Sequence, residues 1–346
     1  MADNRERTFY FDLLRLIAIL GVIIIHESAE CWYDLDVNST AWAVTNVYHS
    51  LGRWAVPVFV MISGALFLDP LRRVDTKKLY SGNILRIVTA FVFWTVFYAA
   101  VRLRGSGSSL MDYIRTAVYG HYHMWFLYMI VGLYIVVPIL RCVTRSEKAT
   151  EYYLAVALVF TFIIPWLMKL PVLSGYQGAY EKMSFFLTLG YTGYFVAGYY
   201  LSVKELNKKQ RAVLYILGIV GQIAGIVLTW SDSVRLGHAS DTYNDYLTLA
   251  VLAQSVAVFV LGKYALSRIR LSERGEKLVL ALSRDCFGVY LVHPFFITEA
   301  SKYLVGDLLL RSPLLWIPVT SLGVAVVSLA VSALLNRIPL MKDYFV

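Results

Sequence analysis

The sequence predicts an all-α fold: a polytopic membrane bundle of about ten transmembrane helices. Composition and the length of the apolar runs predict the fold class, and the distribution of charge predicts the orientation in the membrane. Of the 346 residues, 58% are hydrophobic and only 16% are charged, against about 25% charged in ordinary soluble domains. The apolar runs approach about twenty residues, the length that a helix needs to cross a bilayer. A β-barrel would require alternating segments of about ten residues.

The apolar runs define ten candidate spans. They cover residues 9–29, 46–68, 84–102, 123–140, 151–168, 184–202, 211–230, 244–264, 281–300 and 314–335. The fifth span contains Pro165 and the ninth is interrupted by Pro294, which a bundle tolerates where neighbouring helices or a cavity satisfy the freed carbonyls. The first run is too long for a signal-peptide core and is expected to be the first span. No hydrophilic stretch is long enough to fold alone, so residues 1–346 are expected to form one domain.

Basic residues set the expected orientation. With a cytoplasmic N-terminus, the cytoplasmic segments hold 20 lysines and arginines and the opposite segments hold 8. This asymmetry predicts that both termini are cytoplasmic. The same bias, together with attraction to anionic membrane lipids, explains the net charge of +9 without a nucleic-acid partner.

Several function classes lack their motifs. There is no P-loop and no GxGxxG sequence, so neither ATP-driven work nor dinucleotide binding is indicated. No metal is expected, because the three cysteines and six histidines show no metal-ligand spacing. Cys31 is expected outside and Cys142 inside, so these two cannot pair across the bilayer. No internal repeat is evident, which weakens a transporter interpretation.

Arg15 and His26 are the most informative pair. Nine of the ten residues between them are aliphatic and the tenth is Gly21. A step of eleven residues is three helical turns plus roughly 20°, so both side chains share one face, about 16 Å apart along the axis. Intramembrane ionisable residues usually face a bundle interior or a wet cavity and mark functional sites.

Each member of the pair has a functional and a structural interpretation. Arg15 is either an anchor for an anion that arrives from the cytoplasm, or a snorkelling arginine neutralised by Asp12. His26 is either a satisfied structural histidine or a general base toward a hydroxyl. The base interpretation gains from Glu30, one turn further on, which is placed to accept the imidazole N–H and set the tautomer.

Other polar groups lie at predicted span ends. His49 and Arg53 share a helix face near the outer surface, where they either anchor the interface or bind substrate. His123, Trp125 and Tyr128 open the fourth span and form either an aromatic belt or a platform for a sugar acceptor. His121 and His293 are expected to be structural, His293 at the Pro294 break.

A basic cytoplasmic loop precedes the third span. It carries Arg72, Arg73, Lys77, Lys78 and Arg86. Such a run usually reflects topology, but it also suits the phosphates of a cytoplasmic donor. Together with Arg15 these residues would form one continuous path for an anion.

At these residues the chain resembles the acyltransferase 3 family, in the small stand-alone bacterial form that includes O-acetyltransferases of the enterobacterial common antigen. The resemblance covers essentially the whole chain. Five features carry it in family order: the Arg15–x10–His26 motif, VPVFVMISG, HMWFLYMIVGLYIVVPILR, GYFVAGYYL and FGVYLVHPFF. The family often has a tight basic cluster before the third span. Here LYSGNIL separates Lys78 from Arg86, so the base that meets the donor phosphates is left open.

The resemblance implies acyl transfer, usually of acetyl, from cytoplasmic acetyl-CoA to a hydroxyl of an extracytoplasmic glycan or lipid-linked sugar. It implies a bacterial cytoplasmic membrane, an essential His26, and a role for Arg15 toward the donor. Arg15, Arg53 and Tyr128 are all candidates to stabilise the oxyanion, and transfer is either direct or through an acyl-histidine. The first alternative is a transporter or exporter of a small polar molecule or polysaccharide, and the second is a non-catalytic scaffold. The acceptor's identity and the acyl chain are not readable from the sequence.

Overall fold

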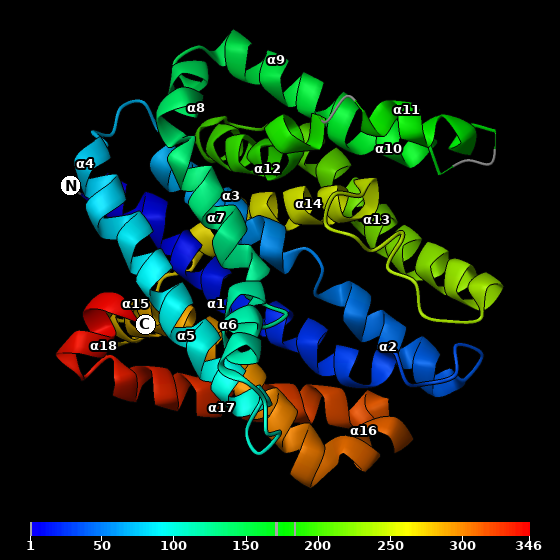
Figure 1. Cartoon of the computed structure of the whole chain (residues 1–346). Coiled ribbons are helices and arrows are strands. Elements are labelled where there is room, and N and C mark those ends of the chain that lie inside the picture. Colours follow the sequence, from blue (N-terminus) through cyan, green and yellow to red (C-terminus); the bar gives the residue numbers. More distant parts are fainter. Residues whose placement is uncertain (1, 170–171, 183–184) are drawn as a thin grey trace.

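A computed structural model describes residues 2–169, 172–182 and 185–346, and the regular structure within these ranges is helical, without strands. The long helices pack into one bundle (Figure 1). In this described part of the chain, eight helices are long and apolar enough to cross a membrane, or up to nine if one bent pair is a single span. The prediction of an all-α, multi-pass membrane protein is therefore confirmed.

Eight predicted spans correspond to helical stretches that meet the length and hydropathy test. These are Phe9–Trp32, Thr40–Phe67, Thr76–Arg102, Glu147–Leu167, Lys208–Leu236, Leu249–Arg268, Glu273–Tyr303 and Pro313–Leu335. The predicted fourth span corresponds to α7 (Trp125–Ile135) and α8 (Val137–Thr144), which are bent by 57°. The predicted sixth span corresponds to α12 (Phe185–Val203), and its residue 184 lies outside the described residues. The exact count of ten and the orientation stay predictions.

Helix α1 (Ala2–Trp32) is the central element. It contacts helices from both halves of the chain, namely α2 (Thr40–Leu51), α3 (Ala55–Phe67), α14 (Leu249–Ala265), α15 (Glu273–Ala300) and α17 (Pro313–Leu335). The second span is broken between α2 and α3, where Gly52 approaches α1 closely. A Cβ at Gly52 would lie 2.4 Å from the carbonyl oxygen of Gly21, so only glycine allows this contact.

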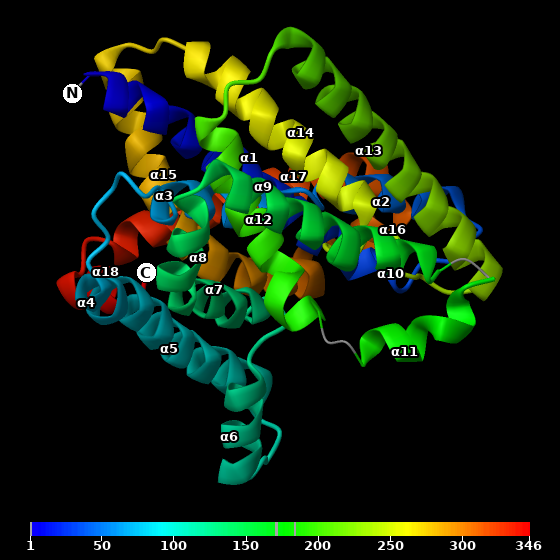
Figure 2. The same cartoon turned by 90° about the horizontal axis from the view of Figure 1, so that it is seen from above.

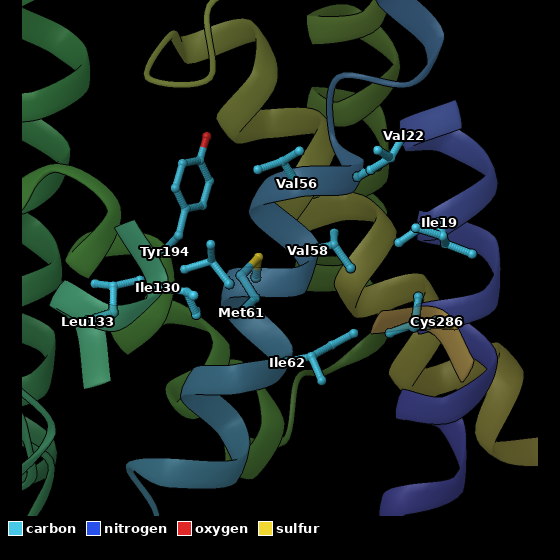
Figure 3. Packing of buried hydrophobic residues seen from close by; sticks show 14 of the residues in the cluster. Ile19, Val22, Val56, Val58, Met61, Ile62, Ile130, Leu133, Tyr194 and Cys286 are labelled. Carbon is cyan, nitrogen blue, oxygen red and sulfur yellow. The ribbon is translucent and has the colours of Figure 1, made fainter. Parts of the chain in front are cut away.

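Helices α3 and α12 also pack so closely that their backbones touch at glycine residues. A Cβ at Gly64 would lie 1.7 Å from the Phe195 carbonyl oxygen, and one at Gly198 would lie 2.0 Å from the Met61 carbonyl oxygen. Small residues at helix crossings in membranes permit such backbone approach. Figure 3 shows the neighbouring core, in which Met61 of α3 lies between side chains of α1, α7 and α12.

The remaining helices complete the bundle. They are α4 (Thr76–Lys78), η1 (Leu79–Ile84), α5 (Leu85–Arg102), α6 (Leu110–Tyr119), α9 (Glu147–Ala157), η2 (Leu158–Ile163), α10 (Ile164–Leu167), η3 (Ser174–Tyr176), α11 (Gln177–Glu181), α13 (Lys208–Leu236), η4 (Leu266–Arg268), η5 (Ser301–Val305), α16 (Gly306–Arg311) and α18 (Pro339–Tyr344). Helix α6 projects away from the bundle in Figure 2. Both chain ends lie on one side of the molecule in Figure 1.

The segment after α17 folds back against α5. The Trp94 indole donates to the Phe345 carbonyl at 2.8 Å, and the Thr89 hydroxyl donates to the Tyr344 carbonyl at 2.6 Å. Val346 is buried. These contacts pack α18 and the residues after it against α5.

Candidate active site

Arg15 and His26 line the same cavity. The cavity holds about 590 Å³ and runs along the face of α1 that these two residues share. Its walls come mainly from α1, α3, α7 and α15, with η1, α5 and α18 at one end. Its polar and aromatic lining includes Arg15, His26, Ser63, Asn83, Arg86, His123, Trp125, Tyr246, Ser283, Arg284, Tyr290, Asn336, Lys342 and Asp343.

One end of the cavity is rich in histidine. The Nδ1 atom of His26 lies 2.7 Å from Nε2 of His293, which α15 brings across from the ninth predicted span. The two ring planes are only 5° apart, as expected for an in-plane hydrogen bond between imidazoles. The ring of Tyr122 stands edge-on to His26 with centroids 5.1 Å apart.

His123 lies beside this pair. Its ring centroid is 5.7 Å from that of His293, and the Tyr290 hydroxyl donates to its backbone carbonyl at 2.5 Å. Its Nδ1 is 3.0 Å from Nδ1 of His121. Its Nε2 is buried and has no hydrogen-bond partner within the part of the chain that the structure describes. This nitrogen is closed off from the cavity, and the His123 ring lies beside the Leu291 carbonyl.

The other end of the cavity is cationic. Arg86, Arg284 and Lys342 line it, and Asp343 is the single carboxylate on the wall among the described residues. The Arg86 guanidinium donates to the Val346 carbonyl. A second cavity of about 430 Å³ shares Arg15 and Arg284 and adds Lys277, so the cationic surface extends outward from the first.

Arg15 combines both interpretations made from the sequence. It forms an ion pair with Asp12 at 3.0 Å, and it also lines both cavities with its side chain 29% exposed. The Ser283 hydroxyl donates to the same Asp12 carboxylate at 2.6 Å. This network fixes the guanidinium at the junction of the two cavities while part of it still faces the space.

Most of the basic loop predicted to hold the donor does not line the two cavities described above, and its role toward the donor stays a prediction. Of that set only Arg86 lines a described cavity, whereas Arg72, Arg73, Lys77 and Lys78 do not. Arg72 pairs with Asp69 at 3.4 Å. The guanidinium of Arg141 donates to the carbonyls of Phe67, Asp69 and Arg72, and these bonds tie the start of the loop to α8.

The structure places His293, and not the predicted Glu30, against Nδ1 of His26. Glu30 does not line the cavities found among the described residues and interacts with Ser301. The group that faces His26 Nδ1 is His293, which the sequence interpretation had left as structural. The reason is that α15 packs against the face of α1 that carries His26. Glu30 lies one helical turn further along α1, nearer to its end at Trp32.

The predicted acceptor residues divide into two groups. His123 and Trp125 line the cavity, while His49, Arg53 and Tyr128 do not in the described structure. The Tyr128 hydroxyl donates to the Val118 carbonyl at 2.8 Å. The role of Arg53 or Tyr128 toward an oxyanion beside His26 stays a prediction.

His49 and Arg53 belong to a separate ionic cluster. Arg53 is 8% exposed and forms an ion pair with Asp241 of the α13–α14 connection, and both also contact His49. Burial opposes ionisation of Asp241, but the hydrogen bond from His49 and the charge of Arg53 lower its pKa to about 2. The Arg53 guanidinium also lies 5.6 Å from the ring centroid of Tyr246, which lines the cavity. This cluster supports the cavity wall from behind.

Sequence reasoning missed the contribution of α15 and α18. Ser283, Cys286, Tyr290 and His293 recur every three or four residues and so share one face of α15. That spacing was a usable signal. Lys342 offered no such signal, because its position depends on the fold-back of the chain after α17.

The sequence profile of the acyltransferase 3 family, described as an acyltransferase domain, matches residues 8–337. The chain belongs to this family and is a multi-pass membrane acyltransferase. No curated protein and no solved structure matches it. The narrower likeness to the enterobacterial common antigen enzymes stays a prediction.

Proposed function

We propose that the protein is an O-acyltransferase of the bacterial cytoplasmic membrane. It moves an acyl group, expected to be acetyl, from cytoplasmic acyl-CoA to a hydroxyl of an extracytoplasmic glycan or lipid-linked sugar. The observation that carries the proposal is one cavity that joins a cationic end to a histidine end along the Arg15–His26 face of α1. A donor with an anionic head and a reactive thioester tail needs both ends.

The cationic end suits the phosphates of acyl-CoA. Arg86, Arg284 and Lys342 converge on it from three different elements, and arginine presents a planar fork of donors that matches phosphate oxygens. The pantetheine arm then extends past Arg15 toward His26, over about 16 Å of helix. In this arrangement the nucleotide stays at the cytoplasmic mouth.

The histidine end suits the transfer step. His26 takes the proton from the acceptor hydroxyl as its oxygen attacks the thioester carbonyl. The carbon–sulfur bond breaks, and the CoA thiol leaves with that proton. The surrounding bundle limits access of water to the thioester.

The test uses the purified protein in lipid nanodiscs. Radiolabelled acetyl-CoA is the donor, and the lipid-linked saccharide fraction of a bacterial envelope is the acceptor. We expect His26→Asn to lower the rate of acetyl transfer about 100-fold or more, while equilibrium binding of acetyl-CoA stays close to wild type. His238→Asn is the matched control, because His238 is exposed in the α13–α14 connection.

Two results would contradict the proposal. Transfer by His26→Asn close to the wild-type rate would remove His26 from the mechanism. Flux of a polar solute through proteoliposomes without consumption of acetyl-CoA would favour the transport alternative instead.

A further inference from the structure

His293 lies against His26 at the histidine end of the cavity, and the proposed transfer step gives it no role. It is fully buried on α15, directly before Pro294. Its Nε2 faces His26 Nδ1 at 2.7 Å, and its own Nδ1 lies 3.1 Å from the Val289 carbonyl oxygen. The three groups therefore form a chain from a backbone carbonyl, through two imidazoles, to the cavity.

The backbone end of this chain determines where the protons lie. A carbonyl oxygen only accepts, so the contact with Val289 requires a proton on Nδ1 of His293. A neutral imidazole carries one ring proton, so Nε2 of His293 is an acceptor. The 2.7 Å contact then requires the proton of His26 on its Nδ1. Nε2 of His26 is left with a free lone pair.

Pro294 leaves one carbonyl beside the His293 ring without its helical donor. Proline has no N–H, so the carbonyl of Tyr290, four residues earlier, lacks its usual helical donor. The ring of His293 lies beside the carbonyls of both Val289 and Tyr290. The ring N–H of His293 thus bonds the Val289 carbonyl and lies beside the Tyr290 carbonyl that Pro294 leaves without a helical donor, and both contacts orient the His293 ring.

We propose that His293 is a positioning residue that holds His26 in the tautomer protonated on Nδ1 and presents the Nε2 lone pair to the acceptor hydroxyl. This inference rests on the proposed role of His26 as general base. When Nε2 takes the acceptor proton, the Nδ1–H bond to His293 persists and supports the imidazolium. His26 then returns the proton to the departing CoA sulfur, so His293 neither gains nor loses a proton in the cycle.

Two variants of His293 separate positioning from packing. His293→Met keeps an apolar side chain of similar length but removes the acceptor. His293→Gln keeps an oxygen that can accept from His26 Nδ1–H. His238→Met is the matched control at an exposed histidine. All variants are measured in nanodiscs, and their thermal midpoints report folding.

We expect His293→Met to lower kcat for acetyl transfer about 100-fold, with KM for acetyl-CoA within about twofold of wild type. His293→Gln should recover at least about tenfold of that loss. The inference is overturned if folded His293→Met keeps a kcat within about threefold of wild type. It is equally overturned if folded His293→Gln is as slow as His293→Met.

A second measurement reads the tautomer without substrate. In protein labelled with ¹⁵N-histidine, protonated and unprotonated ring nitrogens have well-separated chemical shifts, and the His26 signals are assigned by their loss in His26→Asn. We expect a protonated Nδ1 and an unprotonated Nε2 for His26 in wild type, and a shift toward protonated Nε2 in His293→Met. Protonated Nε2 in an active wild-type protein would overturn this inference alone. Protonated Nδ1 in a protein without transfer activity would overturn the proposed function instead.

Discussion

Gly64→Ala tests whether the close approach of α3 to α12 shapes the cavity. The added Cβ would lie 1.7 Å from the Phe195 carbonyl oxygen, where real contacts essentially never fall below 3.0 Å. The two backbones must therefore separate locally by at least about 1.3 Å, because a carbonyl cannot rotate away as a flexible side chain can. Helix α3 carries Phe59 and Ser63 of the cavity wall, so the wall moves with it.

The expected magnitude follows from this collision. Overpacking costs about 1–3 kcal/mol, and contact with backbone places Gly64→Ala near the upper value. At about 2 °C per kcal/mol for a chain of this size, the thermal midpoint falls by about 6 °C. Because a misplacement of about 1 Å near the reacting groups can cost about 100-fold in rate, transfer activity falls more steeply than stability.

The assay compares thermal unfolding and acetyl transfer in nanodiscs. Gly323→Ala on α17 is the control, because its added Cβ meets nothing within 4 Å. Its thermal midpoint should stay the same or rise, because alanine has a higher helix propensity than glycine by up to about 1 kcal/mol. Gly198→Ala probes the same crossing from α12 and should behave like Gly64→Ala. A Gly64→Ala protein with wild-type midpoint and rate would refute the reasoning.

Three further predictions concern charge. Arg284→Gln should raise KM for acetyl-CoA about tenfold through loss of a charged hydrogen bond. Arg73 lies outside the described cavities, so Arg73→Gln should leave KM unchanged. Equal effects of the two substitutions on KM would contradict donor binding at the cationic end. Arg53→Met should lower the thermal midpoint because it removes the permanent cation that pairs with Asp241, and adding Asp241→Asn should restore part of the loss in a double-mutant cycle. The pKa of Asp241 is lowered from 3.8 to about 2, so its contribution to the free energy of unfolding is complete above about pH 4 and is lost as the pH falls toward 2. Because the Asp241 side chain is 39% exposed, we expect this contribution to be about 1 kcal/mol or less. It should be present in wild type and absent in Asp241→Asn.

The sequence predicted the parts of the site that lie on one helix. The spacing of Arg15 and His26 is a property of helix geometry, so their shared face follows from the count of residues between them. The uncharged runs likewise predicted the spans, because a bilayer requires long apolar helices. His123 and Trp125 were singled out by local composition, and both line the cavity.

The sequence could not point to a neighbour that comes from a distant segment. Glu30 was chosen because it is the nearest acceptor along the chain, but His293 reaches His26 from 267 residues away. Arg72 and Lys77 were chosen by their density of charge, and the hydrogen bonds from Arg141 that tie the start of that loop to α8 could not be foreseen. Local patterns carry no information on such packing.

By itself, the sequence determined that the chain is an apolar helical bundle and that one face of its first helix carries a cation and a base. Both follow from local periodicity and hydropathy. Only the tertiary structure decided which groups surround that face: His293 behind His26, Asp12 and Ser283 around Arg15, and Arg284 with Lys342 at the cationic end. The physical reason is that these contacts depend on how α15 and α18 pack against α1 and α5, and packing is set by the whole bundle.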